Sequence, residues 1–269
     1  MIYATSKIGL LALSAALVVA VSLAGTGRSQ AQGNAAPRLA PNGELRTAVI
    51  VSNPVLVTRS PEGQLSGIAV DLATAFAAKL GVPVRMVPYE NTIRYNQSLG
   101  KDEWDIALAP RDLSRTGQLA FSDALLDLDN SYVVRPGLLL RTPDEVDRTG
   151  TRVAVPQGSP IDGFLSRTLK KAELVRLSGG LPSAEEALAY GRADVYADFT
   201  HLAYLVEAEV PGAIVMVGQF NVVRITIVVP KSNEVALPTV NDFVHDAIRH
   251  GLVAEAIKNA GLRGVRPAR

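Results

Sequence analysis

Short apolar runs alternate with amphipathic segments along most of this chain. The apolar runs at residues 45–51, 82–87 and 105–109 predict strands, the first of them buried. Between the first two runs, apolar residues recur at helical spacing, which predicts a helix that begins at Asp71 and ends at Gly81. Strands that alternate with helices of this length are typical of an α/β fold with a mainly parallel sheet.

The same alternation starts again after residue 140. Residues 152–156, 194–197 and 225–229 predict three more strands. Residues 239–260 predict helical structure that is interrupted near Gly251. The repeated pattern suggests two similar α/β lobes.

An internal echo supports two lobes. Gly100 and then Asp105 precede one predicted strand, and Gly191 and then Asp194 precede another, with a basic residue directly after each glycine. Each of these strands ends at a turn that carries charged residues. Because ligands of open α/β sheets bind beyond the carboxyl ends of the strands, these two turns are the first candidates for a binding site.

The first turn carries Arg111, Asp112 and Arg115. A guanidinium can hold a ligand carboxylate through two parallel hydrogen bonds, and Arg115 is the candidate for this role. The alternative for Arg115 is a surface pair with Asp112, and for Arg111 it is a solvated turn residue. The second turn carries Asp198, which either accepts an ammonium group or caps the helix that follows.

Ser159 stands directly after the strand at 152–156, where a helix begins. Backbone N–H groups without intrahelical partners and the positive end of the helix dipole make an anion site there, and the hydroxyl adds a donor. The alternative is plain helix capping by Ser159, with Pro160 at the first helical position. The two roles are compatible.

Residues 1–31 have the pattern of a secretory signal peptide. Lys7 supplies a positive charge, residues 8–24 carry no charge, and small residues lead to a cleavage site after Ala31, with Ala24 as the other candidate. The alternative is an uncleaved membrane anchor, for which the uncharged run is near the lower limit of length. We expect cleavage and a periplasmic protein.

The composition excludes several classes of function. The chain has 269 residues, 27 of them basic and 26 acidic, with no Cys and three His. The absence of Cys removes disulfides, thiolate metal sites and thiol nucleophiles. A near-neutral chain has no basic excess for nucleic acid. We therefore expect no nucleic-acid partner and neither a metal nor an organic cofactor.

Several motifs stand in an order that is typical of one known family. Over about residues 44–262, the chain resembles the bacterial solute-binding protein family 3, the amino-acid-type periplasmic substrate-binding proteins of ABC transporters. Arg115 stands six residues before Phe121-Ser122-Asp123, as in that family. The other motifs that carry the resemblance lie at residues 45–49, 67–73, 104–107, 153–159 and 191–194, with Asp198 after the last of them.

The resemblance implies a fold and its division along the chain. The fold is α/β, a two-lobed periplasmic-binding-protein-like (type II) architecture with two hinge strands. Lobe one would comprise residues 44–134 and 224–269, and lobe two residues 135–223.

The resemblance also implies roles for individual residues. Arg115 would bind a ligand carboxylate, Ser159 would contribute at the start of a lobe-two helix, and Asp198 would accept an α-ammonium group. Arg111 stands where family members usually offer Thr or Ser, and it favours a second carboxylate or another anion. Asn91 follows the second strand and is a further candidate for the pocket, with core or surface roles equally open.

The function implied is that of a periplasmic receptor. It would bind a small polar solute, an amino acid or a related zwitterion, and deliver it as a monomer to an inner-membrane ABC permease. One alternative is an enzyme on the same scaffold, similar to a cyclohexadienyl dehydratase, for which Glu90 is the loose candidate acid. The other is a ligand-sensing partner of a membrane sensor.

Overall fold

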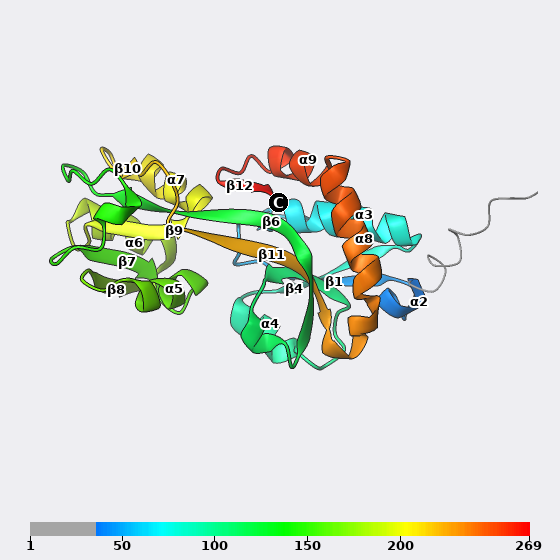
Figure 1. Cartoon of the computed structure of the whole chain (residues 1–269). Coiled ribbons are helices and arrows are strands. Elements are labelled where there is room, and N and C mark those ends of the chain that lie inside the picture. Colours follow the sequence, from blue (N-terminus) through cyan, green and yellow to red (C-terminus); the bar gives the residue numbers. More distant parts are fainter. Residues whose placement is uncertain (1–35) are drawn as a thin grey trace, which may run out of the picture.

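The computed structural model describes residues 36–269 as an α/β protein of two lobes, which Figure 1 shows on either side of a pair of long strands. The expected two-lobed fold with two hinge strands is confirmed. The predicted signal peptide, residues 1–31, lies outside the described residues. Within residues 36–269, no helix is long and apolar enough to cross a lipid bilayer.

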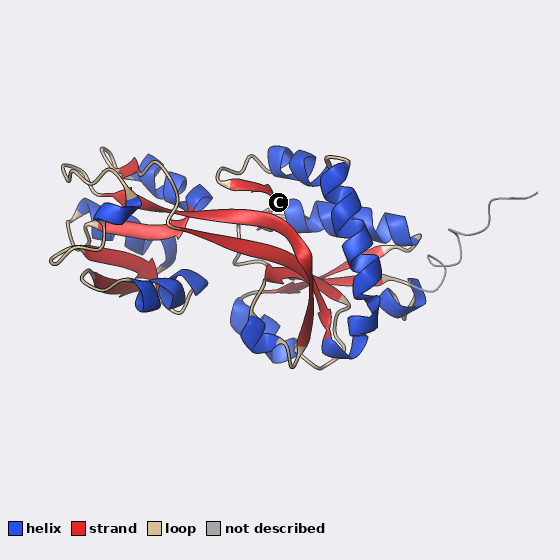
Figure 2. Ribbon diagram, in the orientation of Figure 1, coloured by secondary structure: helices blue, strands red, loops and turns tan. Residues whose placement is uncertain are grey.

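A single mixed sheet runs through both lobes in the order β4-β1-β5-β11-β6-β9-β7-β8 (Figure 2). In lobe one, β1 lies parallel to β4 and β5, and in lobe two, β7 lies parallel to β8 and β9. The carboxyl ends of these parallel strands define one edge of each lobe. The strands are β1 (Leu45–Ile50), β4 (Val84–Tyr89), β5 (Ile106–Pro110), β6 (Leu119–Val134), β7 (Arg152–Pro156), β8 (Glu173–Leu177), β9 (Val195–Phe199) and β11 (Asn221–Pro230).

Helices cover both faces of the sheet. In lobe one, α3, α8 and α9 pack on one face, where the Phe76 and Phe243 rings stack 4.5 Å apart, and α4 packs on the other. In lobe two, α5 covers one face, and α6 and α7 cover the other. The helices are α2 (Ala36–Leu39), α3 (Ile68–Leu80), α4 (Thr92–Ser98), α5 (Pro160–Thr168), α6 (Gly180–Ala189), α7 (Thr200–Glu209), α8 (Leu237–Arg249) and α9 (Leu252–Asn259). The short elements are β2 (Thr58–Arg59), β3 (Leu65–Ser66), β10 (Ile214–Val215), β12 (Val265–Pro267), η1 (Leu113–Arg115), η2 (Pro143–Glu145) and η3 (Lys231–Ala236).

The strand β6 belongs to both lobes. It is 16 residues long, pairs with β11 over most of its length, and pairs with β9 and β10 near its end in lobe two. The apolar pattern of the sequence does not predict this strand, because Asp127, Asp129 and Asn130 interrupt it where it passes between the lobes. Its partner β11 begins at Asn221, four residues before the predicted start at Ile225, because the polar residues Asn221 and Arg224 interrupt the apolar pattern there.

Charged side chains meet on the middle of β6. Arg266, in β12, forms an ion pair with Asp129 and lies 3.4 Å from Asp127. Arg224, in β11, lies 3.9 Å from Asp127, which is only 7% exposed. A carboxylate that is removed from water is costly without a cationic partner, so these contacts hold the C-terminal strand against the hinge.

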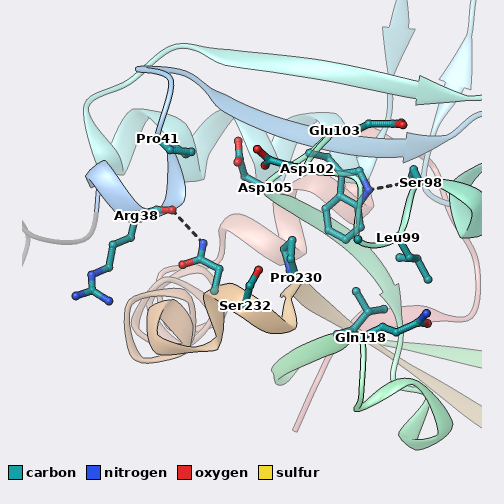
Figure 3. A pocket seen from close by; sticks show the side chains of 14 residues that line it. Arg38, Pro41, Ser98, Leu99, Asp102, Glu103, Asp105, Gln118, Pro230 and Ser232 are labelled. Atoms are coloured by element: carbon teal, nitrogen blue, oxygen red, sulfur yellow. Dashed lines mark hydrogen bonds between the residues drawn. The ribbon is translucent and has the colours of Figure 1, made fainter.

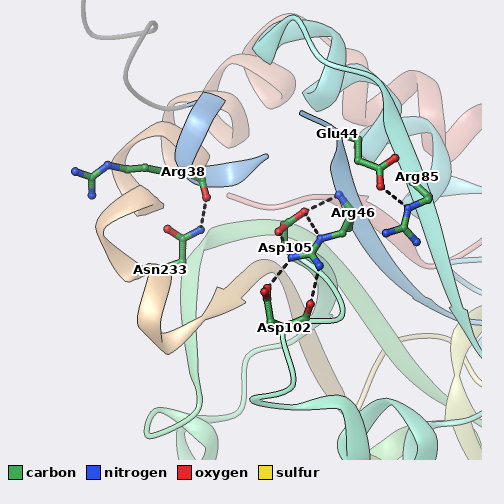
Figure 4. Close-up of polar contacts among 7 residues, drawn as sticks. All are labelled: Arg38, Glu44, Arg46, Arg85, Asp102, Asp105 and Asn233. Carbon is green, nitrogen blue, oxygen red and sulfur yellow. Dashed lines mark hydrogen bonds and ion pairs between the residues drawn. The ribbon is translucent and has the colours of Figure 1, made fainter. Parts of the chain in front are cut away.

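The pattern that repeats before the strands at Asp105 and Asp194 corresponds to the same aspartate–arginine contact in both lobes. In lobe one, Asp105 accepts hydrogen bonds from the backbone nitrogen, Nε and Nη2 of Arg46 at 2.8, 3.0 and 2.7 Å (Figure 4). In lobe two, Asp194 accepts from the same three atoms of Arg152 at 2.9, 3.1 and 3.0 Å. Burial alone would raise the pKa of Asp194, but the bonds from Arg152 and Arg135 outweigh it and lower the pKa to about 2. Both contacts lie at the amino ends of the strands, so the echo marks a structural brace.

The helix predicted from Asp71 begins earlier, at Ile68. Gly67 precedes it with a φ of +111°, and a Cβ at Gly67 would lie 2.8 Å from the carbonyl oxygen of Leu56. The chain enters the helix through this glycine without a side-chain cap, and Asp71 lies inside the first turn. The predicted cap was therefore wrong, whereas the predicted end at Gly81 is confirmed.

The loop before β12 touches lobe two. The guanidinium of Arg263 lies 4.5 Å from the ring centre of Tyr204 in α7. Gly264 has a φ of +66° and packs against Thr200, the first residue of α7. A Cβ at Gly264 would lie 2.4 Å from the Cβ of Thr200. The C-terminal segment thus contacts the shared strand and lobe two together.

We predict that Gly264→Ala lowers the free energy of unfolding by about 2–4 kcal/mol, because a positive φ and a steric clash both oppose the new side chain. Gly261→Ala is the matched control, since Gly261 has a φ of +62° but no heavy atom within 4 Å of its would-be Cβ. We expect the control to lose only roughly 1–2 kcal/mol. Urea unfolding of both variants measures the difference, and equal losses would show that the contact with Thr200 is loose.

Candidate functional site

The residues singled out from the sequence lie at the carboxyl ends of parallel strands, in both lobes. Asn91 follows β4, Arg111 and Arg115 follow β5, Ser159 follows β7, and Asp198 is the second-to-last residue of β9. Because β5 pairs with β11 and β9 pairs with β6, the ends of β5 and β9 lie beside β11 and β6, the two strands that connect the lobes. This is the edge at which an open α/β sheet offers backbone and side-chain groups to a ligand.

Neighbouring side chains of lobe one hold Arg115 in place. Its Nε donates to Asp112 at 3.1 Å, and its Nη1 donates to the Oδ1 of Asn96 in α4 at 2.6 Å. Hydrogen bonds from Ser114, with the charge of Arg115, lower the pKa of Asp112. The Arg115 side chain is 31% exposed, and its Nη2 has no partner within residues 36–269. The predicted surface pair exists, and it leaves one nitrogen available to an anion.

Arg111 is exposed directly after β5. Its backbone nitrogen donates to the carbonyl oxygen of Arg224 in β11 at 3.0 Å. Its guanidinium has no hydrogen bond or ion pair with any residue that the structure describes. Arg224 is not among the candidates predicted from the sequence, although a charged residue within the apolar run 222–229 was a signal for it.

Asn91 and Ser159 both cap helices. The Oδ1 of Asn91 accepts from the backbone nitrogen of Arg94 at 3.0 Å, and the Oγ of Ser159 accepts from the backbone nitrogen of Asp162 at 3.0 Å. These are the capping roles that the residue types favour. Asn91 is also exposed, so its amide nitrogen faces solvent.

The start of α5 already contains an anion of its own. The carboxylate of Asp162 accepts from the backbone nitrogen of Gly158 at 3.0 Å and from the Nε of Arg176 at 3.1 Å. Burial alone would raise the pKa of Asp162, but hydrogen bonds from Gly158, Arg176 and Ser166 outweigh it and lower the pKa. A ligand carboxylate at Ser159 would therefore compete with Asp162 for the helix start.

Asp198 lies in β9 of lobe two and is 4% exposed. It shares a face of β9 with Tyr196, whose hydroxyl donates to one carboxylate oxygen, while the backbone nitrogen of Phe199 donates to the other at 2.7 Å. Burial raises the pKa of Asp198 to about 6, and these two hydrogen bonds oppose the rise. Phe199, on the other face at the end of β9, contacts the apolar cores of both lobes.

The structure brings the candidates together in two groups. Arg111 and Arg115 share one turn of lobe one, whereas Ser159 and Asp198 belong to lobe two. Among the described residues, no hydrogen bond or ion pair joins one group to the other. Any contact that spans the groups has to come from a ligand or from a different separation of the lobes.

A cavity of about 380 Å³ lies at the opposite edge of lobe one, near the amino ends of β1 and β5 (Figure 3). Trp104 forms one wall and donates from Nε1 to the Oγ of Ser98 at 2.9 Å. The carboxylates of Asp102 and Asp105 on its rim bind Arg46. Because the carboxylates of Asp102 and Asp105 are already paired with Arg46, the cavity offers less to a cationic ligand than their charges alone would suggest.

Glu90, the acid named for an enzyme, pairs with Arg59 at 3.0 Å. Its carboxylate therefore already has a cationic partner. Within residues 36–269, no group of three or more His, Asp and Glu side chains is placed to hold a metal ion.

The family model of the bacterial extracellular solute-binding proteins, family 3, matches residues 45–260. The chain belongs to this family. The match covers both lobes and confirms the resemblance drawn from the motifs. No curated protein matches the sequence.

Solved structures share the fold of the chain and resemble it only distantly in sequence. A mutant of ArgBP from T. maritima has 23% identity and a TM-score of 0.66, over 84% of this chain and 99% of that one. An ancestral amino acid-binding protein, described as a precursor of cyclohexadienyl dehydratase, has 20% identity and a TM-score of 0.67, over 83% and 98%. An ancestral cyclohexadienyl dehydratase has 24% identity and a TM-score of 0.53, over 84% and 96%. At these identities the likeness establishes the fold.

We predict that Asp198 makes this family 3 protein less stable as the pH rises from about 4 to about 6. The folded state holds the proton that the unfolded state releases near pH 4, so ionisation costs up to about 3 kcal/mol by neutral pH. Asp198→Asn removes this cost, and its stability relative to wild type should rise by that amount between pH 4 and pH 7.5 in urea unfolding.

Asp242→Asn serves as the control, because Asp242 is exposed on α8. Its stability relative to wild type should change by less than about 0.5 kcal/mol over the same range. If the Asp198→Asn and wild-type profiles run parallel, the carboxyl group of Asp198 ionises in the folded protein as easily as in the unfolded chain.

Proposed function

We propose that the protein is a receptor that captures a small polar solute between its two lobes and delivers it to an ABC importer. Family membership supports a solute-binding role. The observation that carries the proposal is that Arg115 and Ser159 follow the carboxyl ends of parallel strands in different lobes. A solute that contacts both residues stabilises the closed arrangement of the lobes and shifts the population toward it.

The solute is of the amino-acid type and carries a carboxylate. Arg115 and Arg111 supply cations, and Asn91 of lobe one and Ser159 of lobe two supply further polar groups. Charged hydrogen bonds contribute about 1.5–3 kcal/mol each, so two or three of them with some apolar burial reach the roughly 8 kcal/mol of a micromolar complex. The amino-acid-binding proteins among the structural neighbours support this class. An ammonium contact with Asp198 requires its carboxylate to leave the Tyr196 hydroxyl and the backbone nitrogen of Phe199.

The remaining parts of the proposal concern the whole protein. Lobe one comprises residues 44–134 and 224–269, and lobe two residues 135–223, with the solute site between them. A signal peptide cleaved after Ala31 takes the chain to the periplasm, where it acts as a monomer. The partner is an inner-membrane permease.

We predict that Arg115→Ala weakens solute binding by about 100-fold, equivalent to about 3 kcal/mol, because no other cation occupies its place. The solute is first identified by thermal shift on refolded protein, with amino acids, dicarboxylates, opines and polyamines as the panel. A solute at 100 times its Kd adds about 2.7 kcal/mol and raises Tm by roughly 5–10 °C. Calorimetry then gives the affinity of the variant.

Arg85→Ala is the matched control, because Arg85 is a lobe-one arginine at the amino end of β4, paired with Glu44 at 2.6 Å. We expect its affinity to equal that of wild type. A solute that binds equally well to the Arg115→Ala variant would remove Arg115 from the site. The absence of any thermal shift across the panel would contradict the receptor function itself.

A further inference from the structure

Two arginines stand opposite each other where β5 reaches the shared strands. Pro110 pairs with Ile225 in the antiparallel ladder, so the next pair is Arg111 and Arg224, and the backbone nitrogen of Arg111 donates to the oxygen of Arg224 at 3.0 Å. Residues that face each other across a ladder project to the same side of the sheet. The Arg224 side chain is 70% exposed, and Arg111 is exposed as well.

The charges around this pair do not balance. Asp127 lies 3.9 Å from Arg224, but it also lies 3.4 Å from Arg266, and Asp129 pairs with Arg266. Arg224 and Arg266 therefore share two carboxylates, and Arg111 is an additional cation without a carboxylate partner among the described residues. Like charges directly opposite each other on a sheet are destabilising, and an anion placed between Arg111 and Arg224 relieves that repulsion.

The carboxylates at the other strand ends are already occupied. Asp112 accepts from Arg115, Glu90 pairs with Arg59, and Asp162 pairs with Arg176. The fourth, Asp198, is buried in β9 and accepts a hydrogen bond from the Tyr196 hydroxyl. Among the described residues, the strand ends thus offer an unpaired cation and no exposed, unpaired carboxylate.

Resting on the proposed function, we infer that Arg111 and Arg224 together hold an anionic group of the solute, and that the solute carries a net negative charge. Guanidinium groups bind carboxylates bidentately, so two of them enclose one carboxylate with up to four hydrogen bonds. Arg115, on the same turn, remains available to a second anionic group of the same solute. Acidic amino acids and dicarboxylates are the solute classes that meet this requirement.

The test compares solutes that differ in charge and little else. Glutamate and glutamine are nearly equal in size, but glutamate carries one more negative charge, and glutarate lacks the ammonium group. Calorimetry on the chain without its signal peptide, at low ionic strength, should show glutamate and glutarate binding at least tenfold more tightly than glutamine. Arg111→Gln and Arg224→Gln should each reduce this preference to less than twofold.

Arg85→Gln is the control and should keep the full preference. The Tm of the ligand-free Arg111→Gln variant should not fall below that of wild type, because the substitution removes repulsion and leaves no carboxylate unpaired. A lower Tm with the preference intact would mean that Arg111 has a structural role.

The possible outcomes distinguish the inference of a negatively charged solute from the proposed receptor function. Equal affinity of wild type for glutamate and glutamine overturns the inference, as does a preference that both substitutions leave unchanged. If glutamine binds and Arg115→Ala abolishes that binding, the receptor function stands while the inference fails. If none of the three solutes binds, the inference fails for acidic amino acids and dicarboxylates, and the receptor function then rests on the wider thermal-shift panel.

Discussion

The structure depends on one strand that two lobes share. Every backbone hydrogen bond that β6 makes to β11 and β9 ties a lobe to the same sixteen-residue segment. The ladder fixes the register, so the lobes cannot slide along each other, whereas a change in the twist of β6 and β11 changes how the lobes face each other. The ion pairs of Arg266 with Asp127 and Asp129 add a third strand at the point where such a change is concentrated.

The two lobes use their carboxylates differently at their two edges. At the amino ends, Asp105 and Asp194 serve the same structural purpose in each lobe, by accepting the backbone nitrogen and guanidinium of an arginine in the neighbouring strand. At the carboxyl ends the lobes differ. Lobe two satisfies its own acids internally, as Asp162 and Asp198 show, while lobe one leaves Arg111 without a partner among the residues described. The asymmetry places the uncompensated charge on one lobe.

Apolar periodicity predicts β1 and β7 because a strand that is buried in a parallel sheet needs a continuous apolar run. It misses β6, whose central residues are polar, and it misplaces the start of α3, which glycine rather than a capping side chain determines. For the site, topology alone identifies the charged turns, since the carboxyl ends of parallel strands meet at one edge. Topology does not show on which face of β9 the Asp198 side chain lies, because a shift of one residue in a strand reverses that face.

The position of β12 has a consequence for how the chain is made. Lobe two is built from neighbouring segments and is complete in sequence before α8 and α9 are synthesised. Lobe one is completed only when the later elements α8, α9 and β12 (residues 265–267) have been synthesised. Until then the apolar faces of β1 and α3 lack their covering helices, and contacts of such long sequence separation form slowly. The nascent protein therefore has a complete lobe two beside an incomplete lobe one. We expect chaperones to bind the apolar surface that lobe one exposes in this state.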